Sequence, residues 1–427
     1  MGLNRWSVLL VIASGQVFAA DYAEEVESLV ARDDVREALE YISEADDEAE
    51  ARLIELTEIP APPFKESNRA EYYAYLLEEA GAQGVHLDKV GNVIGRIPGE
   101  SGGKTLAIVA HVDTVFPEGT DVKVRREKGR YCAPGIGDNS RGLVTMLLIA
   151  QAIDEAGITP KHDILLVGSV GEEGIGDLRG VRHLLRNGGP RVDEFIGIDG
   201  GGSARITARA VGSIRYRLKI RGPGGHSYGA FGLANPAHAL ARAIHYFDQK
   251  AYAFVKSDGV KATYNIGRIG GGTSVNSIPF ENWAEVDMRS VDSGRLLELD
   301  AIFRRAVETA VNEQNGRRER GKRLKADPER IGLRPAGETP LDTPLVQRVM
   351  ATMRYSGIEP LLREGSTDAN LPMSMGIPAV TIGGGGSTTG AHSLSECWLD
   401  KNSEVAVKNA LVITLASVGV VDASLLH

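Results

Sequence analysis

The chain has 427 residues, of which 42% are hydrophobic and 25% charged, so it is long enough to form two domains with sizeable cores. Its formal net charge of -9 argues against nucleic acid or an anionic membrane surface as a partner, because both are negatively charged. The composition therefore favours a globular protein that acts on small molecules.

The first 19 residues have the pattern of a signal peptide. Arg5 precedes an apolar run over 6–13, and Val17 and Ala19 stand at the positions where signal peptidase requires small residues. The apolar run is too short for a stable membrane anchor. An amphipathic first helix is the alternative. We expect export to the periplasm or beyond, without a membrane anchor.

The next residues predict two helices and the first strands of a sheet. A helical, strongly acidic pattern covers 21–58 and ends at a run of prolines, and a further helix is expected over 68–80. Strands are expected near 85 and over 92–97. Residues 105–109 are apolar and β-branched, which is typical of a buried central strand in an α/β sheet.

Two polar side chains follow this central strand. His111 and Asp113 are two residues apart and point to the same face of an extended chain. The carboxyl ends of strands are where open α/β sheets place their chemistry, and the pair suits a metal ligand with its orienting partner. Taken alone, a histidine at a strand end is more typical of a hydrogen-bonded structural residue.

Further acidic residues recur in the same kind of position. Asp138 lies in a glycine-flanked turn before an apolar helix over 143–156, where a carboxylate also serves as a helix cap. Glu172 and Glu173 stand between glycines after the apolar strand 164–170. Such a pair is costly to bury without a cation, although it is ordinary in an exposed loop.

Two more predicted strands end in the same way. Asp199 follows the strand 194–198, and His392 comes shortly after the strand 379–382 and its glycine run. Oxygen ligands and two imidazoles delivered by several strand ends fit a pair of zinc-like ions.

The two cysteines, Cys132 and Cys397, leave two possibilities open. They can pair in an oxidising compartment, or they can remain free and buried.

The pattern changes between 209 and 333. Residues 213–221 alternate apolar and basic, which predicts a strand with one solvated face. The expected elements that follow are a helix over 236–250, strands over 262–269 and 283–290, a helix over 293–315 and a strand near 323–331. This βαββαβ order suggests a ferredoxin-like insert. The chain then returns to the first domain with helices over 342–356 and 401–418.

The insert contains one competing motif. Gly225, Ser227 and Gly229 match the spacing of a serine-hydrolase nucleophile elbow, for which His392 could be the base. An elbow follows a buried parallel strand, whereas the preceding strand here is half charged and is followed by Pro223. A serine esterase using Ser227 is therefore the weaker alternative.

The ordered motifs from about residue 47 to the C-terminus resemble the dinuclear zinc peptidase and amidohydrolase family of aminoacylase, glutamate carboxypeptidase, tripeptidase T, acetylornithine deacetylase and succinyl-diaminopimelate desuccinylase. The resemblance implies a catalytic domain with a mixed, mainly parallel sheet between helices, and an inserted α+β lid that also forms a homodimer. The implied boundaries are 1–19 for the signal peptide, 20–208 and 334–427 for the two parts of the catalytic domain, and 209–333 for the lid.

The resemblance also implies two Zn²⁺ per chain, with Co²⁺ or Mn²⁺ as possible substitutes. His111 and Asp199 would bind one ion, Glu173 and His392 the other, and Asp138, followed by a cis peptide, would bridge both. Asp113 would orient His111. Glu172 would be the general base that takes a proton from a metal-bridging water and passes it to the leaving amine.

Three residues of the insert resemble substrate-binding positions of the family. His226 would bind the substrate carbonyl oxygen, and Asn276 and Arg289 would bind a carboxylate, for which the planar fork of arginine is suited. A capped loop histidine and an exposed strand arginine are the structural alternatives.

We therefore expect hydrolysis of a peptide or amide bond in a small substrate with a free carboxylate, by a di- or tripeptidase or a carboxypeptidase-like exopeptidase. An N-acyl amino acid deacylase with the same site is the first alternative. A non-catalytic metal-dependent binding protein is a further one, although such a protein would be expected to lack Glu172.

Overall fold

The computed structural model describes residues 21–422, which form two compact units. The first unit contains the chain up to Arg209 and from Glu338 onward, and the second is Ala210–Gly337. Each unit has a hydrophobic core of its own. No helix within 21–422 is both long and apolar enough to cross a membrane. The predicted signal peptide lies outside the described residues.

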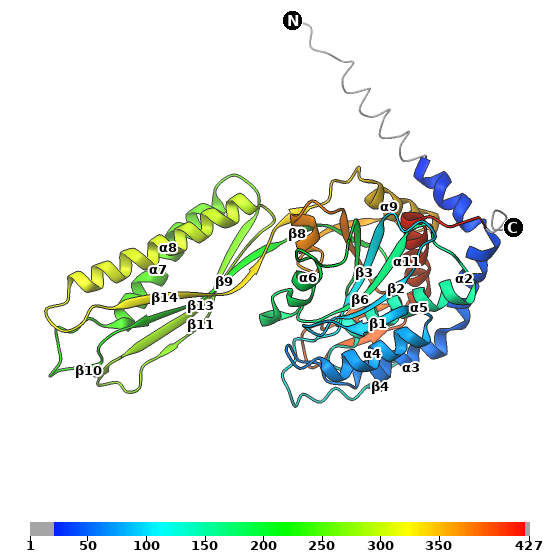
Figure 1. Cartoon of the computed structure of the whole chain (residues 1–427). Coiled ribbons are helices and arrows are strands. Elements are labelled where there is room, and N and C mark those ends of the chain that lie inside the picture. The colour runs from blue at the N-terminus through cyan, green and yellow to red at the C-terminus, as the bar shows by residue number, and fades with distance from the viewer. Residues whose placement is uncertain (1–20, 423–427) are drawn as a thin grey trace, which may run out of the picture. The chain divides into compact units, whose positions relative to one another are not determined.

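The first unit is built on a nine-stranded mixed sheet (Figure 1). Its strands are β1 (Gln83–Leu87), β2 (Val93–Ile97), β3 (Thr105–His111), β6 (Asp163–Ser169), β7 (Glu194–Ile198), β8 (Arg205–Ala210), β15 (Gly337–Glu338), β16 (Leu361–Gly365) and β17 (Ala379–Ile382). The order is β1-β2-β6-β3-β7-β17-β8-β15, with β16 also paired to β8. The central strands β6, β3, β7 and β17 are mutually parallel, so their carboxyl ends meet at one edge.

Helices pack against this sheet and bury its apolar strands. They are α2 (Asp33–Glu44), α3 (Asp46–Thr57), α4 (Ser67–Glu79), α5 (Arg141–Glu155), α6 (Arg179–Leu184), α9 (Pro344–Tyr355), α10 (Asn370–Ser374) and α11 (Ser403–Val418). Helix α4 lies on β1 and β2, and α5 and α11 lie on β3 (Figure 1). Every residue of β6 is buried, as expected for a strand with no solvated face. The predicted α/β class is confirmed.

Two details of the first unit differ from the sequence prediction. The helical stretch expected over 21–58 is divided into helices over 21–30, α2 and α3, with breaks at residues 31–32 and at Ala45. A second, four-stranded antiparallel sheet was not predicted, because its strands are only three residues long. It has the order β18 (Ser387–Thr389), β19 (Cys397–Leu399), β5 (Arg130–Cys132), β4 (Arg125–Glu127).

The helices and the main-sheet strands of the second unit have the predicted βαββαβ order, and two further two-residue strands pair with each other. Its elements are β9 (Gly212–Arg221), β10 (Gly225–His226), α7 (Pro236–Lys256), β11 (Ala262–Gly271), β12 (Ser277–Ile278), β13 (Glu281–Ser290), α8 (Ser293–Gly316) and β14 (Lys325–Arg334). The main sheet is antiparallel with the order β11-β13-β9-β14, which is ferredoxin-like. Tyr216, Phe247 and Phe303 form an aromatic cluster where the two helices cover the sheet.

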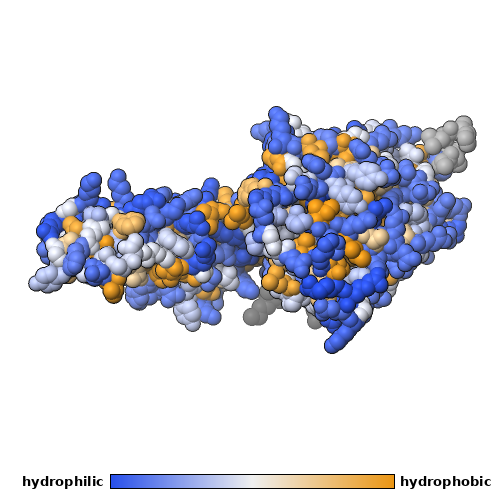
Figure 2. Space-filling view, turned by 90° about the horizontal axis from the view of Figure 1, so that it is seen from below, coloured by the Kyte–Doolittle hydropathy of each residue, from blue (hydrophilic) through white to orange (hydrophobic). Residues whose placement is uncertain are grey.

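Hydrophobic side chains are concentrated inside each unit. The face shown in Figure 2 is mostly hydrophilic, with hydrophobic residues in scattered groups. Large apolar side chains that remain exposed in the first unit include Phe64, Ile175 and Leu394. Single exposed apolar residues of this kind are ordinary on protein surfaces.

Candidate metal centre

The carboxyl-end edge of the parallel strands brings together the predicted ligands of the first unit. His111 is the last residue of β3, Glu172 and Glu173 follow β6, and Asp199 follows β7 directly. Asp138 lies in the loop before α5, and His392 lies in the loop after β18. Because parallel strands all point their carboxyl ends to one edge, segments far apart in the sequence meet here.

Asp138 lies between the two histidines and offers one oxygen to each. Its Oδ1 is 3.0 Å from His111 Nε2, and its Oδ2 is 3.1 Å from His392 Nε2. The peptide bond after Asp138 is cis, as the family resemblance predicts. This is the arrangement that a carboxylate needs in order to bridge two ions.

Each histidine has a further carboxylate beside it. Asp199 Oδ1 lies 3.9 Å from His111 Nε2, and Glu173 Oε1 lies 2.7 Å from His392 Nε2. Within each of the two groups, His111–Asp138–Asp199 and Asp138–Glu173–His392, one ligand atom per residue lies within 4.8 Å of the others. Glu172 forms another such group with His111 and Glu173, so its carboxylate is also at the centre.

The main chain of Asp113 orients the ring of His111. His111 Nδ1 lies 2.9 Å from the Asp113 carbonyl oxygen, which can only accept a hydrogen bond, so Nδ1 keeps its proton and Nε2 is the nitrogen that would bind a metal. The Asp113 carboxylate is farther away, with Oδ1 at 3.8 Å from Nδ1. It accepts hydrogen bonds from the main-chain N–H groups of Glu172 and Glu173 over 3.0 and 2.8 Å.

The centre combines buried carboxylates with imidazoles of high proton affinity. Burial alone lowers the pKa of His111, but the hydrogen bond to Asp138 and the nearby carboxylates raise this pKa well above its usual value. Hydrogen bonds to Asp138 and Glu173 raise the pKa of His392 to about 10. Burial raises the pKa of Asp199, and the charge of Asp138 adds to this effect. Protons on the histidines thus neutralise carboxylates that a divalent cation would otherwise neutralise.

The donor set fits two zinc-like ions, because imidazole and carboxylate are zinc ligands and the two groups share one carboxylate. The two sides of the centre differ in exposure. The side chain of His111 is 2% exposed, whereas that of His392 is 55% exposed. Within the first unit, the centre is therefore open to solvent on the His392 side.

The loop that carries Asp138 is shaped by its glycines. Gly135 has a φ of 83°, a backbone angle that residues with a Cβ rarely adopt. At Gly137, a Cβ would lie only 2.2 Å from Thr388 Oγ1, so there is no room for a side chain. The sequence pattern identified this turn because glycines flank an acidic residue ahead of an apolar helix.

Two contacts at the centre were missed by sequence reasoning. The Glu396 carboxylate accepts main-chain hydrogen bonds from the Asp138 loop, and the Arg205 guanidinium donates to the main-chain oxygen of Asp199. Burial raises the pKa of Glu396 to about 7, although the hydrogen bonds from Gly135 and Gly137 act in the opposite direction. The partners of Glu396 are about 260 residues away in the sequence, so no local pattern marks it. Arg205 is only six residues from Asp199, but it donates to a main-chain oxygen, which every residue type carries.

The cysteines are paired. Cys132 and Cys397 stand opposite each other in the β5–β19 ladder and form a disulfide, so the alternative of two free thiols is wrong in this structure.

The three predicted substrate-binding residues belong to the second unit. His226 and Asn276 are close together, since β10 pairs with β12 and the Ser227 N–H donates to the Asn276 carbonyl over 2.9 Å. Arg289 lies near the carboxyl end of β13, whereas β12 precedes the amino end of that strand. Its guanidinium donates to the Asp287 carboxylate over 2.8 Å. Their proposed contacts with a substrate stay predictions.

Ser227 does not stand on a nucleophile elbow. It follows the two-residue strand β10, which is exposed and antiparallel to β12, rather than a buried parallel strand. The structure therefore gives no support to the serine esterase alternative.

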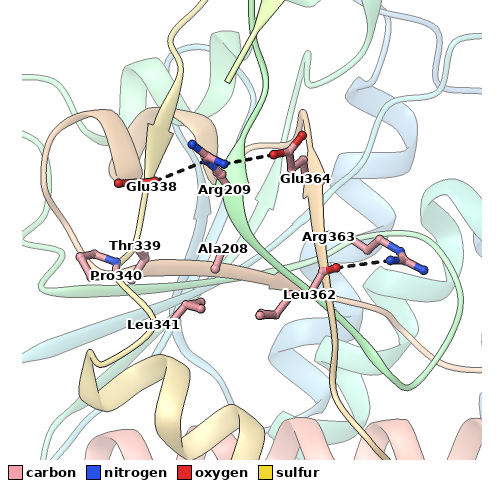
Figure 3. Close-up of a pocket in the computed structure, with 9 residues that line it drawn as sticks. All are labelled: Ala208, Arg209, Glu338, Thr339, Pro340, Leu341, Leu362, Arg363 and Glu364. Atoms are coloured by element: carbon pink, nitrogen blue, oxygen red, sulfur yellow. Dashed lines mark hydrogen bonds and ion pairs between the residues drawn. The ribbon is translucent and has the colours of Figure 1, made fainter. Parts of the chain in front are cut away.

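The first unit also has a cavity of about 820 Å³ away from these ligands, lined by 208–209, 338–341 and 362–364 (Figure 3). Arg209 is one of the lining residues, and its guanidinium lies between Glu338 and Glu364, at 3.4 and 3.3 Å. None of the candidate ligands lines this cavity. The candidate ligands are thus gathered at the strand ends and not in this cavity.

Comparisons with known proteins identify the family of the chain. Residues 107–414 match the model of Peptidase family M20/M25/M40. A protein of Pyrococcus abyssi, provisionally named a LysW-lysine/LysW-ornithine hydrolase, is 28% identical over 343 residues, covering 78% of this chain and 84% of that protein.

Solved structures share the fold. A Staphylococcus aureus tripeptidase superposes with a TM-score of 0.69 at 21% identity, covering 87% of this chain and 98% of that chain. A Bacillus subtilis protein described as a dinuclear metal-binding peptidase of the M20 family superposes with a TM-score of 0.64 at 17% identity, covering 88% and 99%. The chain therefore belongs to peptidase family M20/M25/M40 and is a hydrolase.

Proposed function

We propose that the chain is a dinuclear zinc exopeptidase that hydrolyses a peptide bond in a small substrate with a free carboxylate. The observation that carries this proposal is the position of Asp138, which directs one carboxylate oxygen to His111 and the other to His392. A carboxylate placed in this way would hold two ions close together, as two-metal hydrolases require.

In this proposal, His111 and Asp199 would hold one ion, Glu173 and His392 would hold the other, and Asp138 would bind both. When bound, the ions supply Lewis acidity toward the scissile carbonyl and acidify water. The protein contributes the orientation of each ligand. Nδ1 of His111 is fixed by the Asp113 carbonyl, and the turn that carries Glu173 is fixed by the Asp113 carboxylate.

Glu172 is the proposed general base. Its side chain is buried beside the ligands, and its main chain is held by Asp113, so the carboxylate has a defined place. It takes a proton from the attacking water and delivers it to the nitrogen of the leaving amine. Glu173, its neighbour in sequence, has its carboxylate on His392 instead. Adjacent glutamates can thus fill two different roles.

The test is a metal analysis of the purified protein together with an activity screen. The screen uses di- and tripeptides and N-acetyl amino acids, before and after treatment with a chelator. We expect about two zinc-like ions per chain and peptide cleavage that chelation abolishes and Zn²⁺ or Co²⁺ restores. Activity that survives complete metal removal would overturn the proposal, and cleavage of only N-acetyl substrates would assign the deacylase alternative.

We further propose that the protein is exported and works in an oxidising compartment. The pairing of Cys132 with Cys397 supports this proposal, because structural disulfides persist where thiols are not kept reduced. Fractionation and N-terminal sequencing of the mature protein test it. Cleavage after residue 19 is expected, and an intact N-terminus in the cytoplasm would contradict it.

A homodimer through the second unit is also proposed. The strand β11 supports it, because β11 is at the edge of its sheet and six of its ten residues are exposed. Light scattering after size-exclusion chromatography tests the mass in solution. A monomer at micromolar concentration would contradict the proposal.

A further inference from the structure

Glu396 is a buried acid that the mechanism above does not use. It lies four residues after His392 and is 0% exposed. Its Oε2 accepts a hydrogen bond from the Gly135 N–H over 3.0 Å, and its Oε1 accepts from the Gly137 and Asp138 N–H groups over 2.8 and 3.0 Å. All three donors belong to the loop that carries the shared carboxylate.

The segment that contains Glu396 is also linked covalently to the residues that precede this loop. The next residue, Cys397, is joined by the disulfide to Cys132, which precedes Gly135 by three residues. Trp398 then lies against Arg141, with the guanidinium carbon 5.1 Å from the ring centroid. The Asp138 loop is therefore connected to β19 on both of its sides, by the disulfide before it and by this contact after it.

The hydrogen bonds that the Glu396 carboxylate accepts come from uncharged main-chain groups. Among the described residues, its hydrogen-bond donors are peptide groups, and burying a carboxylate without a cationic partner is costly. The main-chain N–H of Asp138 is one of these donors, so the carboxylate binds the backbone of a ligand residue directly. Cations bound by Asp138 would offset the negative charge that Glu396 adds to this part of the protein.

We propose that Glu396 is a positioning residue, which holds the loop 135–138 so that the Asp138 carboxylate stays between His111 and His392. The inference rests on the proposed metal centre and deepens it. Two carboxylate oxygens satisfy three N–H groups here, so a side chain with a single acceptor oxygen cannot replace Glu396. The loop would then be free to turn Asp138 away from one histidine.

The test is the affinity of the metal-free protein for Zn²⁺, measured with a competing chromophoric chelator, and the absorption spectrum of the Co²⁺ form. In Glu396→Gln, an amide group replaces one acceptor oxygen and faces an N–H donor. We expect the dissociation constant for Zn²⁺ to rise about 10- to 100-fold, the usual effect of losing a group that orients a metal ligand. The Co²⁺ spectrum should change, and kcat should fall more than KM rises.

Asp163→Asn is the matched control. Asp163 is also a buried carboxylate that accepts a main-chain hydrogen bond, from Gly99 over 2.8 Å, but it is at the start of β6, the end opposite the metal centre. A purely structural role for Glu396 would lower the melting temperature of both variants and leave both Zn²⁺ affinities unchanged. The proposal requires that only Glu396→Gln loses affinity.

The outcomes separate this inference from the proposed function. If the wild-type protein binds no metal, both fail. If the wild type binds two ions and a folded Glu396→Gln binds them equally tightly with an unchanged Co²⁺ spectrum, only the positioning role fails. If Glu396→Gln does not fold, Glu396→Asp, which keeps both oxygens but shortens the side chain by one methylene, takes the same test with the same criterion.

Discussion

The main-chain N–H of Glu172 donates to Asp113 Oδ1 over 3.0 Å. The carboxylate that follows β3 therefore holds the turn that follows the neighbouring strand β6. The other oxygen of Asp113 accepts from the next residue of that turn, over 2.8 Å. The same residue orients His111 through its carbonyl group. Asp113 thereby connects the imidazole of a proposed metal ligand to the turn that carries the proposed base.

The first prediction concerns this connection. Asp113→Asn replaces one acceptor oxygen with an amide group, which leaves one buried N–H of the turn without a partner. We expect a loss of about 1–3 kcal/mol in the free energy of unfolding. We also expect metal affinity or activity to fall about 10- to 100-fold. Urea unfolding and a Zn²⁺ competition titration measure the two effects, and wild-type values in both would show that the hydrogen bonds are unimportant.

The second prediction separates metal binding from proton transfer. Glu172→Gln keeps the size of the side chain but cannot take a proton, so we expect two bound ions and a decrease in kcat of about 10²–10⁴-fold. Metal analysis and steady-state kinetics measure these quantities. Glu364→Gln is the control, because Glu364 is an exposed residue paired with Arg209 away from the centre. Normal turnover in Glu172→Gln would rule out this base.

The third prediction is that metal binding depends on pH. Hydrogen bonds to carboxylates raise the pKa of both His111 and His392, so both hold protons that a metal must displace. Affinity for Zn²⁺ should therefore rise with pH, and binding near pH 7 should release protons. Calorimetric titrations in buffers of different ionisation enthalpy would detect this release. Identical heats in all buffers would contradict the prediction.

Whereas the affinity for Zn²⁺ should rise with pH, the stability of the metal-free protein should fall with pH. A histidine with a raised pKa stabilises the folded state below its unfolded pKa of about 6.5. This stabilisation is lost as the pH rises through the folded pKa, which is about 10 for His392. The contribution of His392 is reduced by solvent, because its side chain is half exposed. Melting temperatures of the chelated protein between pH 6 and pH 10 should therefore fall.

The fourth prediction concerns the disulfide between Cys132 and Cys397. The double variant Cys132→Ser/Cys397→Ser should lose about 2–4 kcal/mol in the free energy of unfolding, since a long loop is no longer closed in the unfolded chain. Urea unfolding with and without a reductant measures this loss. The reductant should destabilise the wild type and leave the double variant unchanged, so equal effects on both would count against a structural disulfide.

Much of the fold could be predicted from local patterns. The apolar runs of β3 and β6 predict buried strands, and the alternation of Ile214, Tyr216, Leu218 and Ile220 predicts a strand with one buried face, because side-chain direction in a strand depends only on the residue's place along it. Short elements such as β18 and β19 have too few residues for a pattern, so they were missed.

The candidate metal residues could be found for a related reason. Parallel strands deliver their carboxyl ends to one edge, so residues that follow separate apolar runs, such as His111, Glu173 and Asp199, can be expected to meet once the strands are recognised. The sequence alone therefore determined the fold class, the family resemblance and the set of acidic and imidazole side chains available for metal binding.

Only the tertiary structure decided how these side chains are held. The pairing of Cys132 with Cys397, the three hydrogen bonds to Glu396 and the hold of Asp113 on the turn after β6 all join segments that are distant along the chain. Their geometry depends on the packing of the whole first unit. No local pattern contains that information, because a hydrogen bond to a main-chain N–H places almost no requirement on the type of residue that donates it.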